Sequence, residues 1–220
     1  MDSVDYVGIG VYSPQEVARY VRAQTQQIRR WFGAYDGTDA LWQPQLPEVD
    51  GDIALGFLDL MEVRLVKELR LQKVPLQTIR YCIKRAQEIT EETHPFATKH
   101  IKTDGQTLFL EIADQSGDRD LLNLKNSQWG FEQLIRDSLL NVEFDMDGAA
   151  SRWFPLGFNS SVVLDPRINF GQPTLGDTGI PVNVVLRLLE TDLSTEEVCE
   201  QFDITTKAAN DSLAFSRIAA

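Results

Sequence analysis

A helix-start signal near the amino terminus constrains the fold of this chain more than any other feature. Residues 13–16 read Ser-Pro-Gln-Glu. The serine can cap free backbone N–H groups, the proline suits the first helical position, and the glutamate can close a capping box. Val17, Tyr20 and Val21 follow at helical spacing. The pattern predicts a short amphipathic helix directly after Ser13.

A second short helix is expected after a brief turn. It should run from Thr25, as its cap, to Phe32, with Ile28, Trp31 and Phe32 facing the core. Two short helices joined in this way predict a helix-turn-helix.

The next stretch combines a loop with two longer helices. Residues 33–50 are rich in Gly, Pro and Asp, which predicts a hairpin or loop in the position of a wing. Trp42 in this loop is open to either core packing or recognition. Residues 57–71 then carry apolar residues at helical spacing, and Pro75 starts a further helix. The expected core positions are Phe57, Leu58, Met61, Leu65, Val66, Leu69, Leu76, Ile79, Ile83 and Ala86. The polar faces hold Arg64, Lys67, Arg70, Lys73, Arg80, Lys84 and Arg85, expected to be a solvated surface that could assist contacts to a DNA backbone.

After His94-Pro95 the hydrophobic period changes to two. Residues 99–103 and 107–112 flank Asp104-Gly105, which predicts two strands and a tight turn. Residues 113–120 are expected to be a loop, and residues 128–140 return to helical spacing. We expect a linker near residues 155–160.

The last sixty residues form a separate predicted unit. Residues 161–164 are expected to be a short strand, and residues 165–181 are dense in Gly, Pro and Asp. Three helices should follow, at residues 182–190, 195–201 and 207–218, with Ser194–Glu197 as a capping box and Thr205 as the last cap. They contain a second possible helix-turn-helix.

The expected fold is therefore mainly α with small β elements. A winged helix-turn-helix occupies residues 1–96, an α/β linking segment residues 97–158, and a strand with three helices residues 159–220.

The net charge and its distribution limit the classes of partner that the chain can bind. The net charge is −12, and residues 1–102 hold 13 Lys/Arg against 14 Asp/Glu while residues 103–220 hold 8 against 19. A uniformly basic nucleic-acid binder is excluded, whereas the acidic second half could steer a basic protein partner. No apolar run is long enough to span a bilayer and no secretory signal is present, so we expect a cytoplasmic protein without membrane contact.

Two segments resemble known families. Residues 10–93, with YSPQEVARYVRAQTQQIRRW and then FLDLMEVRLVKELRLQKVPLQTIRYCIKRAQE, resemble the MerR-type winged helix-turn-helix. The carboxy-terminal region resembles a small domain family of unknown function, number 433. Its marks are a turn with Gly171, Pro173, Gly176, Thr178, Ile180 and Pro181, followed by Val182 and Ser194–Glu197. One departure is Gly179, where that family commonly has an arginine.

The whole arrangement resembles the larger VapB-type antitoxins. The resemblance implies a protein that neutralises a PIN-like ribonuclease toxin and represses its own operon by binding operator DNA. A homodimer is expected, because helix-turn-helix readers usually pair across two half-sites.

Candidate DNA contacts lie on and before the second helix. Glutamine can bind adenine and arginine can bind guanine through two hydrogen bonds in the major groove, while other polar side chains contact phosphate. The candidate residues are Arg22, Gln24, Thr25, Gln26, Gln27, Arg29 and Arg30.

Other motifs have simpler interpretations. His94 and His100 have no metal-ligand spacing, and Cys82 and Cys199 are expected to be buried side chains rather than a disulfide. Glu143 to Gly148 imitates the start of a calcium loop, but Phe154 occupies the position of the bidentate carboxylate; a turn between strands is expected. The Asp-Thr-Gly at residues 177–179 has no second carboxylate motif for aspartic-protease chemistry. We expect no catalysis, no metal and no cofactor.

Two other functions remain open from the sequence. One is a stand-alone MerR-like transcriptional regulator that senses a small ligand and has no toxin. The other is an interaction scaffold, which predicts no DNA binding.

Overall fold

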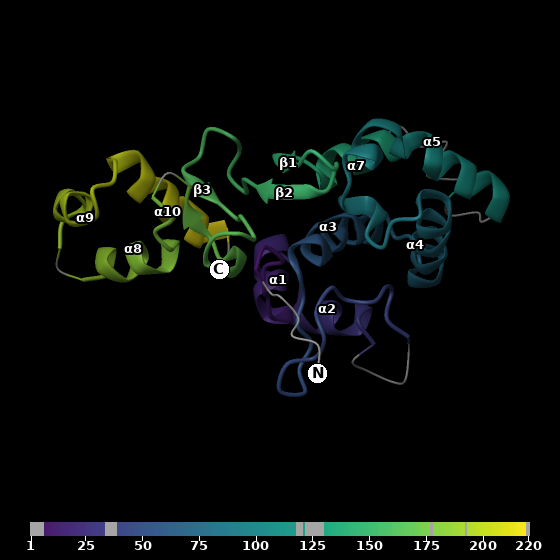
Figure 1. Ribbon diagram of the computed structural model, residues 1–220, viewed down its shortest axis with the longest axis horizontal. Coiled ribbons are helices and arrows are strands. Elements are labelled where there is room, and N and C mark those ends of the chain that lie inside the picture. The colour runs from purple at the N-terminus through teal and green to yellow at the C-terminus, as the bar shows by residue number, and fades with distance from the viewer. Residues whose placement is uncertain are drawn as a thin grey trace.

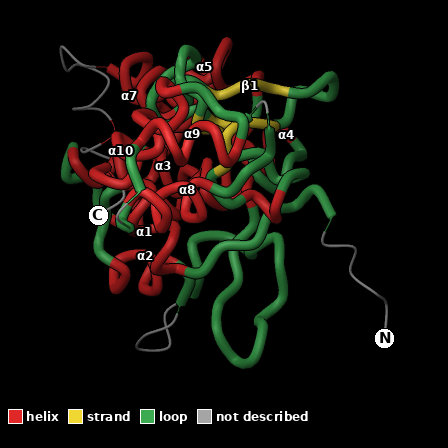
Figure 2. The backbone as a smooth tube through the Cα atoms, turned by 90° about the vertical axis from the view of Figure 1, so that its left-hand side faces the viewer, coloured by secondary structure: helices red, strands yellow, loops and turns green. Residues whose placement is uncertain are grey.

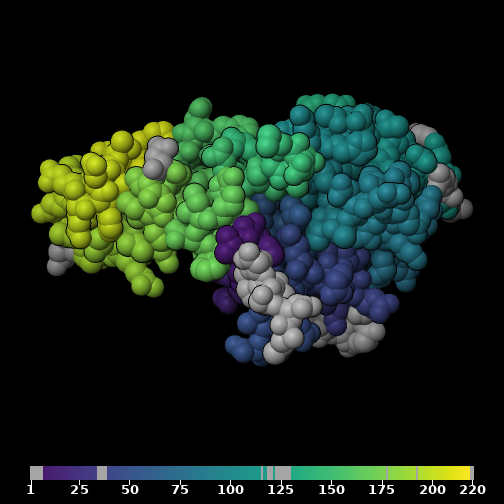
Figure 3. Space-filling view, viewed as in Figure 1, coloured from purple at the N-terminus to yellow at the C-terminus, as the bar shows by residue number. Residues whose placement is uncertain are grey.

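Helices dominate the computed structural model, which describes residues 7–33, 39–117, 121, 130–176, 178–191 and 193–218. Over these residues the chain has nine α-helices and two two-stranded antiparallel sheets. The mainly helical fold with small β elements is thereby confirmed. The first helices lie in the centre, the last residues form one end of the molecule and α5 and α7 lie toward the other (Figures 1 and 3).

The helix-turn-helix consists of α1 (Pro14–Val21) and α2 (Thr25–Trp31), which pack against each other. The predicted capping box is confirmed: Ser13 Oγ accepts from the Glu16 amide, and the Ser13 amide donates to the Glu16 carboxylate at 2.8 Å. Thr25 was wrong as the second cap. Gln24 occupies that position, and its amide donates to Gln27 Oε1 at 3.1 Å.

The region after α2 forms a minimal hairpin. Val49 and Asp52 exchange both backbone hydrogen bonds around Asp50 and Gly51. Both central residues have positive φ, which is the conformation of a tight hairpin turn and explains the Asp-Gly pair. Leu55 then pairs with Tyr12 in an antiparallel bridge, so the hairpin is attached to the start of the helix-turn-helix. Loops project beyond α1 and α2, toward the bottom of Figure 2.

The two longer helices agree with the sequence pattern. They are α3 (Phe57–Leu71) and α4 (Leu76–Thr90). Their expected core positions are buried, except for the half-buried Leu58 and Leu76. A short 3-10 turn, η1 (Pro95–Ala97), follows α4 and packs on α3.

The two strands expected at 99–103 and 107–112 are wrong, because residues 99–116 form one helix, α5 (Lys99–Ser116). The same apolar residues also satisfy helical spacing, and Ile101, Phe109 and Ile112 are buried on one face. Gly105 does not make a turn. A Cβ at this position would lie 2.8 Å from Ile135 Cδ1, so the glycine permits close packing of α5 on α7. The expected loop at 113–120 is helical to Ser116, and residues 118–120 lie outside the described residues.

The helix expected at 128–140 is present as α7 (Gly130–Ser138), although residues 128 and 129 lie outside the described ones. A hairpin of β1 (Val142–Phe144) and β2 (Ala150–Trp153) follows it. The turn predicted in place of a calcium loop is confirmed, and Asp145 Oδ1 accepts from the Ala149 amide at 2.9 Å.

The carboxy-terminal unit contains β3 (Val162–Val163), the 3-10 turn η2 (Asn169–Gly171), β4 (Thr174–Leu175) and three helices. The helices are α8 (Val182–Leu189), α9 (Thr195–Phe202) and α10 (Thr206–Ile218). Both predicted caps are confirmed, since Ser194 and Glu197 form a capping box and Thr205 Oγ1 accepts from the Ala208 amide. The strand β4, paired with β3, was not predicted.

A buried carboxylate joins the parts of the amino-terminal region. Asp59 Oδ1 accepts from Trp42 Nε1 at 2.7 Å and lies 3.0 Å from His94 Nε2. Its Oδ2 accepts from the amides of Gly56 and Gln45. Asp59 is fully buried, and these partners replace the water that its charge loses. Trp42 is therefore a core residue with a polar contact.

Glu62 lies one helical turn further and has a different environment. Its Oε1 accepts from the Phe96 amide at 2.9 Å, whereas its buried Oε2 has no hydrogen-bond partner. Burial raises the pKa of Glu62 well above its ordinary value of 4.5, and the charge of Asp59 adds to the effect. Burial thus favours the neutral form of Glu62 inside the core.

Replacing Glu62→Gln should remove a pH-dependent weakness of the fold. A group whose pKa is raised on folding contributes full stability below its unfolded pKa and loses it as pH rises toward the folded pKa. In urea unfolding from about pH 5 to about pH 9, the unaltered chain should lose stability relative to the variant by about 1.4 kcal/mol for each pH unit between the ordinary and the raised pKa. The exposed Glu200→Gln serves as the control. Parallel pH profiles for the Glu62→Gln variant and the unaltered chain would contradict the prediction.

Candidate functional site

The candidate DNA-reading residues lie on the surface of the helix-turn-helix. Five of them are exposed: Arg22, Gln24, Gln26, Gln27 and Arg30. Thr25 and Arg29 are half-buried. Arg22 ends α1 in a left-handed conformation. The sequence pattern thus places polar and basic side chains together on the turn and on the outer face of α2.

Arg29 contacts the hairpin of its own chain. Its two terminal nitrogens donate to the two carboxylate oxygens of Asp52, each at 2.8 Å. These bonds hold the pKa of Asp52 below its ordinary value. Such a fork is geometrically specific, so it orients α2 against the Asp50-Gly51 turn. Arg29 therefore has a structural contact that the sequence analysis did not foresee.

Part of the basic surface of α3 and α4 also has structural roles. Arg64 is not a solvated side chain: its guanidinium carbon lies 4.4 Å from the centre of the Trp153 ring, and Nη2 donates to the Leu140 carbonyl. Arg70 donates to the carbonyl of Val74, and Arg80 to that of Asp39. These three arginines therefore make contacts within the chain that hold loops and the β2 strand in place.

The turn at η2 has an unusual backbone. Asn169, Phe170 and Gly171 have φ values of 47°, 54° and 81° in succession. This left-handed region costs roughly 1–2 kcal/mol for a residue with a side chain. Asn169 Nδ2 donates to the Gly179 carbonyl at 2.7 Å, which helps to hold the turn.

The turn is fastened to the start of the helix-turn-helix. The Val11 amide donates to the Phe170 carbonyl, and the Tyr12 hydroxyl donates to the Gly171 carbonyl, both at 2.9 Å. A Cβ on Gly171 would lie 2.1 Å from Tyr12 Oη. Burial raises the pKa of Tyr12, which keeps the hydroxyl protonated and able to donate. Only glycine fits this contact between the two units.

A series of side-chain hydrogen bonds also links α1 to the residue after the η2 turn. Gln172 accepts from the Tyr20 hydroxyl at 3.1 Å and donates to Glu16 Oε1 at 3.0 Å. The Tyr20 ring also packs against Phe215 of α10, with 5.9 Å between ring centres. Burial, followed by the charge of Glu16, raises the pKa of Tyr20 to about 12. Helix α1 is thus held to the carboxy-terminal unit by polar and aromatic contacts.

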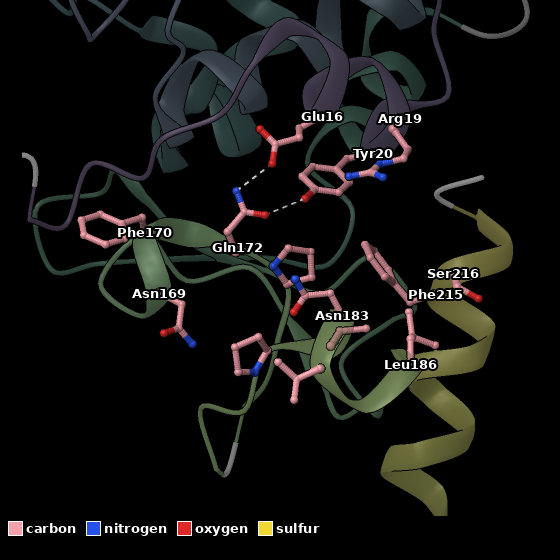
Figure 4. A pocket seen from close by; sticks show the side chains of 14 residues that line it. Glu16, Arg19, Tyr20, Asn169, Phe170, Gln172, Asn183, Leu186, Phe215 and Ser216 are labelled. Atoms are coloured by element: carbon pink, nitrogen blue, oxygen red, sulfur yellow. Dashed lines mark hydrogen bonds between the residues drawn. The ribbon is translucent and has the colours of Figure 1, made fainter. Parts of the chain in front are cut away.

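A cleft of about 730 Å³ opens at this junction. Figure 4 shows the α1 side chains on one wall, the η2 turn on another, and the α8 and α10 side chains opposite. Its volume lies within the range of ordinary ligand sites. The sequence analysis found several of its residues as turn or core positions, but no local signal indicated that they enclose a cleft.

The other motif-turn residues shape the loop between β4 and α8. Pro173 is buried, Ile180 and Pro181 are half-buried, and Gly176 and Thr178 are exposed. Thr178 Oγ1 accepts from the Ile180 amide. Gly179 has a φ of +69°, so an arginine there would be strained. Asp177 of the Asp-Thr-Gly triplet lies outside the described residues.

The histidines and cysteines have structural surroundings. His94 is buried against Asp59, and His100 is exposed beside Asp104. Cys82 is buried and Cys199 half-buried, and no disulfide joins them.

In the described ranges no group of three His, Cys, Asp or Glu side chains is placed to hold a metal ion. None of the described helices is long and apolar enough to cross a membrane.

A family model matches the carboxy-terminal unit. Residues 162–216 match the family described as "Protein of unknown function (DUF433)". The matched segment contains the η2 turn, β4 and the three last helices.

A named protein and a crystal structure, both from Mycobacterium tuberculosis, are similar to nearly the whole chain. One is named "Putative antitoxin VapB45"; it is 26% identical over 227 residues, which cover 93% of each chain. The other is the crystal structure of Rv2018, which is 24% identical, covers 94% of this chain and 98% of that one, and has a TM-score of 0.76. The structural likeness establishes a shared fold.

A Gly171→Ala substitution should destabilise the junction strongly. Its methyl group meets both the left-handed backbone cost and the Tyr12 hydroxyl, so we expect a loss of at least about 3 kcal/mol in urea unfolding. Gly51→Ala is the matched control, because Gly51 has a similar φ of +77° and nothing within 4 Å of the added Cβ. That variant should lose only about 1 kcal/mol. Equal losses in the two variants would show that the Tyr12 contact is unimportant.

Proposed function

We propose that this chain is an antitoxin that binds a protein toxin and represses its own operon through the helix-turn-helix. The observation that carries the proposal is the likeness, over 93% of both chains, to a protein named as an antitoxin. The likeness extends through the helix-turn-helix as well as the carboxy-terminal unit, so one relative accounts for both parts. Because antitoxins act by binding, the same likeness indicates that this chain is a binding protein rather than an enzyme.

The DNA-binding part of the proposal rests on α2. Its outer surface combines Gln24, Gln26, Gln27 and Arg30 in exposed positions, and such side chains suit base edges and phosphates. The Arg29–Asp52 fork fixes α2 relative to the hairpin. We infer that the helix and the hairpin act as a rigid reader, a MerR-like winged helix-turn-helix, in a homodimer on two half-sites.

The toxin-binding part rests on the carboxy-terminal half. Residues 103–220 hold 8 basic and 19 acidic side chains, and α9 exposes Glu196, Glu197 and Glu200. An acidic surface attracts a protein whose nucleic-acid groove is basic. A PIN-like ribonuclease is the toxin class that the resemblance implies.

A small-ligand regulator is the second candidate, and the 730 Å³ cleft beside α1 favours it. The two candidates differ in one requirement. An antitoxin needs a toxic protein partner, whereas a ligand-sensing regulator acts without one.

Co-expression with the reading frame next to its gene tests the main proposal. We expect that frame alone to stop growth, and co-expression of this chain to restore growth and yield a complex on gel filtration. A harmless neighbour, or a toxic neighbour that this chain neither binds nor silences, would sink the antitoxin proposal and leave the regulator.

Arg30→Ala should weaken binding to a DNA fragment from upstream of the chain's own gene. Loss of one arginine–base contact costs about 1–3 kcal/mol, so we expect about tenfold or greater weakening in fluorescence anisotropy. If Arg30 contacts phosphate instead, the salt dependence should fall by about one unit. Arg136→Ala on α7, where the arginine pairs with Glu132, should bind as the unaltered chain does. Unchanged affinity and unchanged salt dependence for Arg30→Ala would contradict the assigned face.

A further inference from the structure

The helix-turn-helix and the hairpin that follows it carry charges of opposite sign. Residues 14–31, which contain α1 and α2, hold four arginines and one glutamate, whereas residues 32–56 hold five Asp or Glu and no Lys or Arg. The hairpin exposes Glu48, Asp50 and Asp52. Figure 1 shows it, in blue, below α1 and α2. Carboxylates repel DNA phosphates, so the hairpin adds repulsion rather than affinity beside the DNA-reading helix.

Asp52 places one of these carboxylates directly on α2. Arg29 Nη1 and Nη2 donate to its two oxygens, each at 2.8 Å, and the Ile53 amide donates to Oδ1 at 2.9 Å. The hydrogen bonds from Arg29 hold the pKa of Asp52 below its ordinary value, so the carboxylate is ionised at neutral pH. A guanidinium binds a carboxylate or a phosphate through the same pair of parallel hydrogen bonds. Asp52 therefore occupies the two donors of Arg29 that a DNA phosphate would use.

The contact is held in place by the backbone but remains open to exchange. Val49 and Asp52 form both backbone hydrogen bonds of the turn at 2.9 Å, and Leu55 pairs with Tyr12 just before α1. The Arg29 side chain is nevertheless 32% exposed and that of Asp52 53% exposed. Ion pairs as accessible as this are weak and are screened by salt. An arriving phosphate can therefore compete with the carboxylate for the guanidinium.

We propose that Asp52 is an intramolecular competitor that withholds Arg29 from DNA phosphates and thereby lowers the affinity of the helix-turn-helix for DNA. The inference rests on the proposed DNA-binding function and assigns a regulatory contact to the same surface. DNA binding either proceeds without Arg29 or requires Arg29 to leave Asp52. In both cases removal of the carboxylate strengthens binding, because one more cation becomes available to neutralise a phosphate.

The same pair also orients α2 against the hairpin, and the two roles predict opposite effects. If Asp52 only supports α2, its loss should loosen the DNA-reading surface and weaken DNA binding. If Asp52 competes with phosphate, its loss should tighten DNA binding and make it more dependent on salt. Affinity and salt dependence measured together therefore distinguish a competitor from a support.

The decisive variant is Asp52→Asn, which removes the charge but keeps an oxygen that can accept from the Ile53 amide. Fluorescence anisotropy on the full chain should use two DNA duplexes, one from upstream of the chain's own gene and one of unrelated sequence. We expect both to bind about fivefold more tightly, and the salt dependence of the affinity to rise by about one unit, as for one additional phosphate contact. Because exposed ion pairs contribute little to stability, the variant should melt at nearly the temperature of the unaltered chain.

Asp50→Asn is the matched control. It removes the same charge from the same turn, asparagine tolerates the positive φ of 52° at this position, and the carboxylate that Arg29 binds is left in place. Its DNA affinity should stay within about twofold of the unaltered chain, with the same salt dependence. In a chain that also carries Arg29→Gln, Asp52→Asn should gain no more affinity than Asp50→Asn does, because the gain acts through Arg29.

Three results would overturn the competition. If Asp52→Asn binds no more tightly than Asp50→Asn, Asp52 is a support for α2 and the DNA-binding function stands. If the gain persists in the chain with Arg29→Gln, the carboxylate acts on DNA directly rather than through the arginine. If neither the unaltered chain nor any variant binds either duplex, the DNA-binding function fails together with the competition. Binding by Asp52→Asn where the unaltered chain does not bind supports the competition in its strongest form.

Discussion

The amino-terminal region depends on one buried carboxylate. Asp59 lies at the start of α3 and gathers hydrogen bonds from Trp42, from the backbone of the loop before α3, and from His94 after α4. Hydrogen bonds to a charged group contribute about 1.5–3 kcal/mol each, and an unpaired buried donor costs a similar amount. The loop before α3 and the segment after α4 therefore meet at a single buried carboxylate. The loop at Trp42 and Gln45, the start of α3 and the segment after α4 are held together by it.

Hydrogen bonds also join distant segments at the junction between the two units, but there the groups are neutral. Tyr12 pairs with Leu55 through its backbone and donates to Gly171 through its hydroxyl. One residue thus connects the hairpin, the helix-turn-helix and the carboxy-terminal turn. The close approach leaves no space for a side chain at Gly171 and fixes the adjacent Phe170 at the edge of the cleft. A packing requirement inside the junction is therefore also what leaves the Phe170 side chain exposed at the edge of the cleft.

The proposed functions share this architecture. Arg29 of α2 pairs with Asp52 of the hairpin, and the cleft is formed by α1 and the carboxy-terminal unit. Because α1 packs directly on α2, the two surfaces are supported by one small core. The acidic residues are concentrated in the second half of the chain, so the two regions differ in charge.

Local patterns determined the positions of most helices. Capping boxes at Ser13 and Ser194 and the helical spacing of residues 57–71 act within a few residues, so the sequence alone locates them. It failed at α5, where an alternating pattern also satisfied a helix, and where Gly105 serves the packing on α7 instead of a turn. The turn residues around Gly171 were also visible, but their role was not. Tertiary structure decided that Arg29 pairs with Asp52, that Asp59 is a buried hub, and that Tyr20, Phe170 and Phe215 enclose one cleft, because these contacts join residues that are distant in the chain and leave no periodic signal in it.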